Sequence, residues 1–122
     1  ISKGELFCII GHSGCGKTSL LRTIAALEVA TAGELNIPPL KPYKLANIGM
    51  VFQAHGLFPW MTVRNNIRFL LENNIHLANH NLDAIADEYI SLVGLTKFAD
   101  FFPRQLSGGM RQRVSIARSF AN

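Results

Sequence analysis

A string of eight residues near the amino-terminus has the pattern G-x-x-x-x-G-K-[ST] of a phosphate-binding loop. Its members are Gly11, His12, Ser13, Gly14, Cys15, Gly16, Lys17 and Thr18. Glycines let consecutive backbone N–H groups converge on one anion, and a following helix adds the positive end of its dipole. Lys17 would reach the β- and γ-phosphates of a triphosphate, and the Thr18 hydroxyl would supply a ligand to Mg²⁺. The alternative is a glycine-rich turn that binds nothing.

A second anion receptor is predicted near the other end of the chain. Ser107 is a good capping residue, and it is followed by Gly108, Gly109 and several arginines. A capped helix start with two glycines lets an anion approach the backbone closely. One chain therefore carries two helix starts suited to phosphates. Either one nucleotide lies between them, or two copies of the chain share two nucleotides.

The elements that position the first loop follow an α/β pattern. The apolar run Leu6–Ile10 predicts a strand buried on both faces, and the apolar spacing from Lys17 to Leu27 predicts the helix that follows. Two further strands are predicted at Glu34–Ile37 and Ile48–Phe52. The expected fold is therefore a parallel-sheet core of the type found in P-loop nucleoside triphosphatases.

Beyond Pro59 the pattern changes to amphipathic helices. Thr62 can cap a helix whose apolar face holds Val63, Ile67, Leu70 and Leu71, and Asn73-Asn74 would end it. Asn81 can cap a second helix that stops at Gly94. We expect residues 1–57 to belong to the core, residues 58–106 to form a helical subdomain, and residues 107–122 to form the helix that begins at Ser107.

Composition narrows the classes of function. Charged residues make up 16% of the chain and hydrophobic residues 48%, which excludes a disordered chain. The net charge is +4, and the carboxy-terminal arginines are better explained by nucleotide phosphates than by nucleic acid, so no nucleic-acid partner is expected. The longest apolar runs are far shorter than the roughly 18 residues of a membrane span. Cys8 and Cys15 are interpreted as reduced thiols in a cytosolic setting.

Three motifs in this order resemble the ATP-binding-cassette (ABC) family of ATPases. The loop at residues 11–18 resembles its Walker A motif, Gln53 after an apolar run resembles its Q-loop, and the string LSGGMRQRV from Leu106 resembles its signature motif. The resemblance covers essentially the whole chain, and the signature string is its most specific part. One departure is Ala26, which stands where the family commonly has glycine.

The resemblance implies a head-to-tail dimer in which the Walker A motif of one subunit and the signature motif of the other enclose ATP. Lys17 and Gln53 would be catalytic, with Gln53 sensing Mg²⁺ and the attacking water, and Thr18 and Gln53 would be the Mg²⁺ ligands. Ser107, Gly108 and Gly109 would contact the γ-phosphate across the dimer interface. The implied nucleotide-binding residues are Gly11, Ser13, Gly14, Cys15, Gly16, Lys17, Thr18, Ser19, Gln53, Ser107, Gly108 and Gly109.

Within the family, residues 57–63 and 102–105 look most like importers of nitrate, sulfonate or taurine. The resemblance therefore implies an ATP-hydrolysing importer subunit, peripheral on the cytoplasmic face of the membrane, with transmembrane permease subunits as partners. The alternative is a soluble ABC-type ATPase that is not coupled to transport. The cluster from Phe58 to Met61 is either packed in the core or a hydrophobic docking site for a permease helix.

The resemblance also implies parts that lie outside this chain. The family's Walker B strand, its catalytic glutamate and its switch histidine would follow Asn122, so we expect a fragment with an incomplete core that is inactive alone. Asp100 is the nearest carboxylate to a Walker B position, and its place before the signature string favours a surface role. His76 and His80 have the i, i+4 spacing of a zinc pair without a third ligand, which favours a polar linker.

Overall fold

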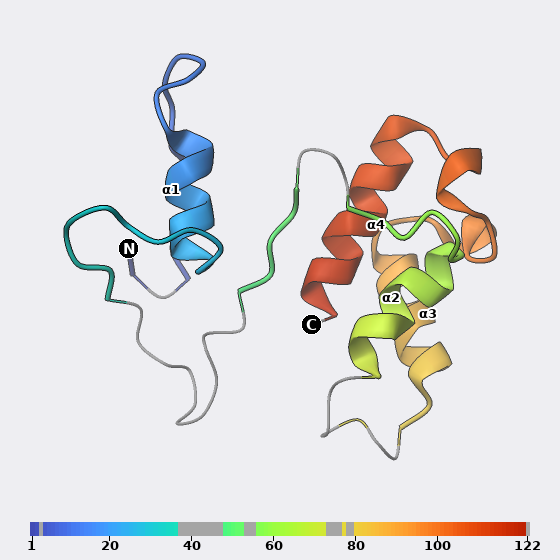
Figure 1. Ribbon diagram of the computed structural model, residues 1–122. Coiled ribbons are helices and arrows are strands. Elements are labelled where there is room, and N and C mark those ends of the chain that lie inside the picture. Colours follow the sequence, from blue (N-terminus) through green and yellow to red (C-terminus); the bar gives the residue numbers. More distant parts are fainter. Residues whose placement is uncertain (3, 37–47, 53–55, 73–76, 78–79, 122) are drawn as a thin grey trace. The chain divides into compact units, whose positions relative to one another are not determined.

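The computed structural model describes residues 1–2, 4–36, 48–52, 56–72, 77 and 80–121. The elements described there are the helices α1 (Lys17–Ile24), α2 (Val63–Leu71), α3 (Leu82–Leu92) and α4 (Gly108–Phe120), and the short 3-10 helices η2 (Thr96–Phe98) and η3 (Pro103–Gln105) (Figure 1). None of the described helices is long and apolar enough to cross a membrane. The chain divides into two compact units, Ile1–Ile48 and Gly49–Asn122.

The first unit contains the phosphate loop and α1 but no strand among its described residues. Residues 6–10 have no strand conformation, and Leu6 and Ile10 are 98% and 90% exposed. The prediction of a doubly buried strand at Leu6–Ile10 is therefore wrong for this structure. A parallel strand is stable only when neighbours pair with its backbone and helices cover its faces, whereas here α1 has no buried residue.

The other two predicted strands are also not seen in the described part of the chain. Residues 34–36 and 48–52 have no strand conformation. Ile37, the last residue of one predicted strand, lies outside the described residues. The same physical reason applies, because a short apolar run forms a strand only when a neighbouring strand accepts and donates its backbone hydrogen bonds.

Helix α1 begins at Lys17, as predicted, and ends before Leu27. The N–H of Ala26 donates to the Thr23 carbonyl at 3.0 Å, and the N–H of Leu27 donates to the Arg22 carbonyl at 2.8 Å. These two bonds form a Schellman motif, which requires a left-handed residue just past the helix. Ala26 takes that conformation with φ 56°, so the position where the family commonly has glycine is one where a Cβ is strained.

We expect Ala26→Gly to stabilise the protein. Removing the Cβ from a left-handed residue relieves strain of about 1 kcal/mol. The matched control is Ala25→Gly, because Ala25 has an ordinary φ of −76° and glycine there only adds freedom to the unfolded chain. Urea denaturation followed by circular dichroism should show opposite signs for the two variants, and equal destabilisation would contradict the prediction.

The three helices of the second unit begin at the predicted capping residues. The Thr62 and Ser107 side chains each accept a hydrogen bond from the N–H three residues on, at 3.2 and 3.3 Å. Asn81 accepts from the two N–H groups at the start of α3, both at 3.2 Å. Helix α3 is followed by Gly94 with φ 69°, as predicted. Asn73 and Asn74, which we expected to end α2, lie outside the described residues.

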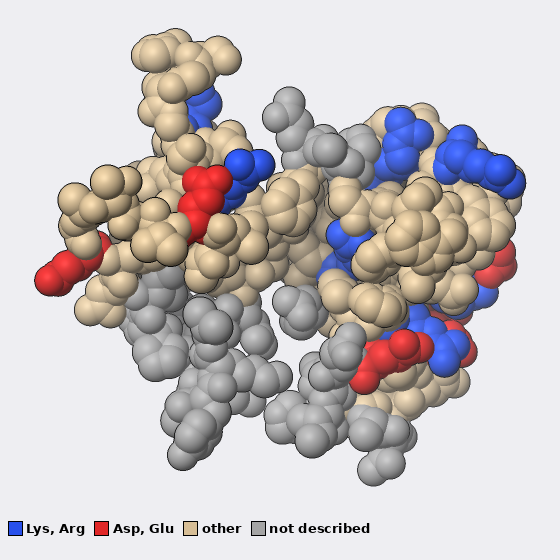
Figure 2. Space-filling view, viewed as in Figure 1, with Lys and Arg blue, Asp and Glu red and all other residues tan. Residues whose placement is uncertain are grey.

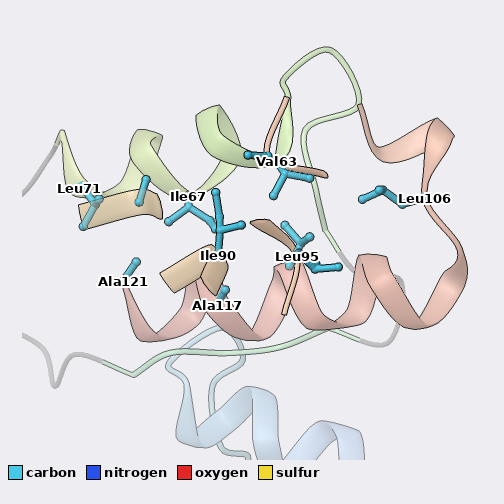
Figure 3. Close-up of a cluster of buried hydrophobic side chains, with 11 residues drawn as sticks. Val63, Ile67, Leu71, Ile90, Leu95, Leu106, Ala117 and Ala121 are labelled. Atoms are coloured by element: carbon cyan, nitrogen blue, oxygen red, sulfur yellow. The ribbon is translucent and has the colours of Figure 1, made fainter. Parts of the chain in front are cut away.

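Helices α2, α3 and α4 pack against one another around one hydrophobic core. Most of the predicted apolar face of α2 is buried, while Leu70 is half-buried. Leu106 also lies in the core, 4% exposed, which fixes the residue just before the signature helix. The labelled core residues in Figure 3 are Val63, Ile67, Leu71, Ile90, Leu95, Leu106, Ala117 and Ala121.

Ion pairs on the surface of this unit join its helices. Arg64 of α2 donates from Nε to Asp87 of α3 at 2.8 Å and also pairs with Asp100. The hydrogen bond to Asp87 is the main reason that the pKa of Arg64 is raised above its ordinary value. Figure 2 shows acidic and basic side chains adjacent on this face. Asp100 is thus a surface carboxylate, as predicted.

Candidate functional site

The phosphate loop reaches α1 through backbone shapes that require glycine. Gly14 has φ 81° and Gly16, the residue before the helix, has φ 93°, and both values strain any residue with a Cβ. Glycine is favoured at position 11 for a different reason, because a Cβ there would lie 2.6 Å from the Cys15 Sγ atom. Apart from the flanking residues, no described protein atom lies within 4 Å of a Cβ built at Gly14 or Gly16, so the loop is open at these two positions.

The Lys17 side chain lies across this loop. Its Nζ atom donates to the carbonyls of Gly11 at 2.8 Å and His12 at 2.6 Å, and lies 3.5 Å from the Cys15 sulfur. No side chain caps α1, so the N–H groups of its first turn, which includes Thr18 and Ser19, stay free for a ligand. An ammonium group beside free N–H groups at the positive end of a helix makes a receptor for an anion.

The start of α4, the second predicted receptor, also has free N–H groups, whereas the start of the neighbouring helix α2 does not. At the start of α2 the N–H groups of Val63 and Arg64 donate to backbone carbonyls, each at 2.9 Å. At the start of α4 the Ser107 side chain caps only the N–H of Met110. The N–H groups of Gly108 and Gly109 have no acceptor within their own helix. The fold thus leaves open the two helix starts that the sequence predicts to bind phosphate.

The two glycines of α4 are not required by the fold. Neither has a left-handed φ. A Cβ at Gly109 would have no atom within 4 Å, and one at Gly108 would meet only Arg111 Nη2 at 4.0 Å. Glycine in a helix costs about 1 kcal/mol relative to alanine. Nothing in the described part of the chain therefore requires glycine at these two positions.

Gln53, the remaining predicted catalytic and Mg²⁺-sensing residue, lies outside the described residues, as do Ala54 and His55. Among the residues that the structure describes, no group of three His, Cys, Asp or Glu side chains is arranged to hold a metal ion. Of the two histidines with i, i+4 spacing, His76 lies outside the described residues. The Thr18 hydroxyl, in the first turn of α1, is an oxygen donor of the kind that Mg²⁺ prefers.

Asn66 organises the loop that precedes α2, and it is not among the predicted site residues. It is fully buried, and its Nδ2 atom donates to the carbonyls of Phe58 at 3.1 Å, Met61 at 3.1 Å and Thr62 at 3.0 Å. Its Oδ1 atom accepts from the Phe58 N–H at 2.8 Å. The sequence signal for this role is a polar residue within the apolar face that runs from Val63 to Ile67.

The loop held by Asn66 presents an aromatic cluster. The Phe58 ring lies 5.6 Å from that of Trp60 and 5.0 Å from that of Phe69. Arg118 of α4 stacks over Phe58 at 5.5 Å, and burial lowers the pKa of Arg118 below its ordinary value. Trp60 is 69% exposed, so the packing alternative does not hold for this side chain.

Comparison with known proteins identifies the family. All residues, 1–122, match the family described as ABC transporter. The chain belongs to the ABC transporter family. Among solved structures, this ABC transporter chain is similar to a dimeric ATP-binding cassette described as a post-hydrolysis state bound to ADP and Pi, with a TM-score of 0.77 and 34% identity over 92% of this chain and 54% of that chain. Its fold class is therefore that of the ABC cassettes, which is consistent with the predicted α/β class, although the described part of this chain contains helices and no strand.

The chain is also similar to curated proteins that are named as ATP-binding proteins of import or transport systems. The ABC transporter chain is 47% identical over 122 residues to the nitrate import ATP-binding protein NrtD of Synechocystis sp., covering 99% of this chain and 46% of that protein. It is 44% identical over 126 residues to the putrescine transport ATP-binding protein PotG of Escherichia coli, covering 99% of this chain and 33% of that protein. The chain thus spans less than half the length of these relatives.

Proposed function

We propose that the full-length protein is the ATP-binding and ATP-hydrolysing subunit of an ABC-type membrane importer, and that Mg²⁺ accompanies ATP. The observation that carries this proposal is the phosphate loop, where the Lys17 ammonium and the free N–H groups of α1 form one receptor. The substrate class proposed is an anion similar to nitrate, sulfonate or taurine. The similarity to the nitrate import ATP-binding protein supports this choice.

The described residues of the phosphate loop supply the positive charge and the free N–H groups that a triphosphate would need. The triphosphate would lie against the loop, with Lys17 on the β- and γ-phosphates and Thr18 as an Mg²⁺ ligand. The other residues proposed to contact it are Gly11, Ser13, Gly14, Cys15, Gly16 and Ser19. Gln53 is proposed to sense Mg²⁺ and the attacking water. Phosphoryl transfer depends on positioning the reactants and on stabilising negative charge. The residues proposed here would contribute to both.

The proposed partner for nucleotide binding is a second ATPase subunit, arranged head to tail. Ser107, Gly108 and Gly109 would contact the γ-phosphate held by the other subunit. The free N–H groups of the two glycines and the absence of any fold requirement for glycine support this proposal. The dimeric cassette that the chain resembles is a further support.

The other proposed partners are transmembrane permease subunits, with the protein peripheral on the cytoplasmic face of the membrane. The exposed Trp60 ring supports docking at this surface, as does a hollow of about 310 Å³ in the same unit, which is lined by Met61, Asn65, Arg68, Phe69 and Glu72. We also propose that residues 1–57 belong to the core, residues 58–106 to the helical subdomain and residues 107–122 to the signature helix.

The direct test is Lys17→Ala in the full-length protein. Losing a charge-assisted bond to phosphate should lower the affinity for Mg-ATP about tenfold, and hydrolysis should fall with it. A fluorescent ATP analogue measures binding, and phosphate release measures hydrolysis. Lys97→Ala is the control, because it removes an exposed lysine of η2 far along the chain. Unchanged binding in Lys17→Ala, or no Mg-ATP binding by the unsubstituted protein, would show the proposal to be wrong.

A further inference from the structure

Arg111, in the first turns of α4, reaches back across the start of its own helix. Its Nη1 atom donates to the Leu106 carbonyl at 2.7 Å and to the Pro103 carbonyl at 3.4 Å. Its backbone N–H donates to the Ser107 carbonyl at 3.0 Å. The side chain therefore ties η3 and the residue after it to the first turn of α4.

This bond controls the direction of a backbone donor. The Leu106 carbonyl and the Ser107 N–H belong to one planar trans peptide, so they point in opposite directions. When Arg111 holds the carbonyl on one side, the Ser107 N–H is fixed on the other. That N–H begins the run of donors that continues through Gly108 and Gly109. The burial of Leu106 in the core holds the same peptide from its other end.

The position of the charge also favours an anion. A guanidinium group near a helix start adds positive charge to an end that is already positive, so an anion bound there is favoured. Helix α4 has no acidic residue in its first turn to offset the charge. Arg111 Nη2 lies 4.0 Å from the Cβ position of Gly108, so the charge is next to the glycines.

We propose that Arg111 is a positioning residue for nucleotide-dependent pairing of two subunits. It holds the N–H groups from Ser107 to Gly109 in the direction needed to receive the triphosphate of a second copy of the chain. It acts through the backbone of Leu106 and does not contact the nucleotide. This inference rests on the proposed function.

A matched pair of variants on one helix tests it in the full-length protein. Arg113 also donates from Nη1 to a carbonyl, that of Val93 at 2.9 Å, but this carbonyl lies at the end of α3. Arg111→Met and Arg113→Met each lose a guanidinium–carbonyl contact, and both should bind a fluorescent ATP analogue as monomers with unchanged affinity. Dimerisation with Mg²⁺ and a non-hydrolysable ATP analogue, measured by analytical ultracentrifugation, should weaken about tenfold in Arg111→Met alone. The kcat for ATP should fall equally, with KM unchanged.

The behaviour of the variants separates a positioning role of Arg111 from a purely structural one. If Arg111→Met pairs and hydrolyses like Arg113→Met, the role of Arg111 is only structural and the inference is wrong. If Arg111→Met does not fold, Arg111→Lys keeps the charge but not the planar donor, and its pairing should weaken about threefold at an unchanged Tm; normal pairing there would overturn the inference. If the unsubstituted protein fails to pair with the nucleotide, the proposed function is wrong and the inference is wrong with it.

Discussion

Gly109→Ala should make the protein more stable and nearly inactive. An alanine Cβ at this position meets no atom within 4 Å, and alanine is favoured over glycine in a helix by up to about 1 kcal/mol. The same methyl group would occupy the space through which a phosphate reaches the N–H groups of α4. Loss of such preorganised donors lowers kcat about a hundredfold. Stability and activity should therefore change in opposite directions.

Two measurements on the full-length protein check this prediction. Thermal melting should give a higher Tm, and phosphate release should show the loss of kcat. Ser91→Ala is the matched control, because Ser91 is exposed in the last turn of α3 and alanine there also raises helix propensity. This control should gain stability and keep full activity. A Gly109→Ala protein that hydrolyses ATP normally would show that no phosphate approaches this backbone.

Asn66→Leu should destabilise the protein by about 3 kcal/mol. The substitution removes one acceptor and one donor group that together bond the Phe58 N–H and the carbonyls of Phe58, Met61 and Thr62. Leucine is similar in size to asparagine, so the main cost is that buried backbone groups lose their partners. The aromatic loop should also loosen, because Asn66 is the side chain that holds it against α2.

The neighbouring residue supplies the control for this prediction. Asn65 is exposed on the same helix, so Asn65→Ala should change the free energy of unfolding by less than about 0.5 kcal/mol. Urea denaturation measures both variants. Trp60 is the only tryptophan of the chain, so its fluorescence reports directly on the loop. Equal stability of the two variants would contradict the role assigned to Asn66.

The sequence predicted the helix starts of the second unit because capping is a local interaction. Thr62, Asn81 and Ser107 each bond to N–H groups two or three residues away, and that spacing is visible in the chain. The same holds for Gly14 and Gly16, whose left-handed φ values depend mainly on the residue itself. Ala26 also takes a left-handed conformation, which its own residue type does not favour, because the Schellman bonds that end α1 require it.

The predicted strand at Leu6–Ile10 was wrong because strands depend on partners that a single apolar run does not reveal. Apolar alternation or continuity shows that a segment is suited to a sheet, but hydrogen bonding to a neighbouring strand decides whether it forms one. Helix α1, whose backbone bonds are internal, formed at the predicted residue even without a buried face.

The sequence alone predicts the two helix starts proposed to receive phosphate, because the glycines, the Ser107 cap and Lys17 act over a few residues. Packing between segments that are distant in the sequence settles which groups support the helix starts and which groups stay free. Asn66 bonds to a loop that begins eight residues earlier in the chain, and Arg64 reaches Asp87 and Asp100 on other elements. Arg111 holds the carbonyls that precede its own helix. Such partners are brought together by packing of the core, and no local pattern specifies them.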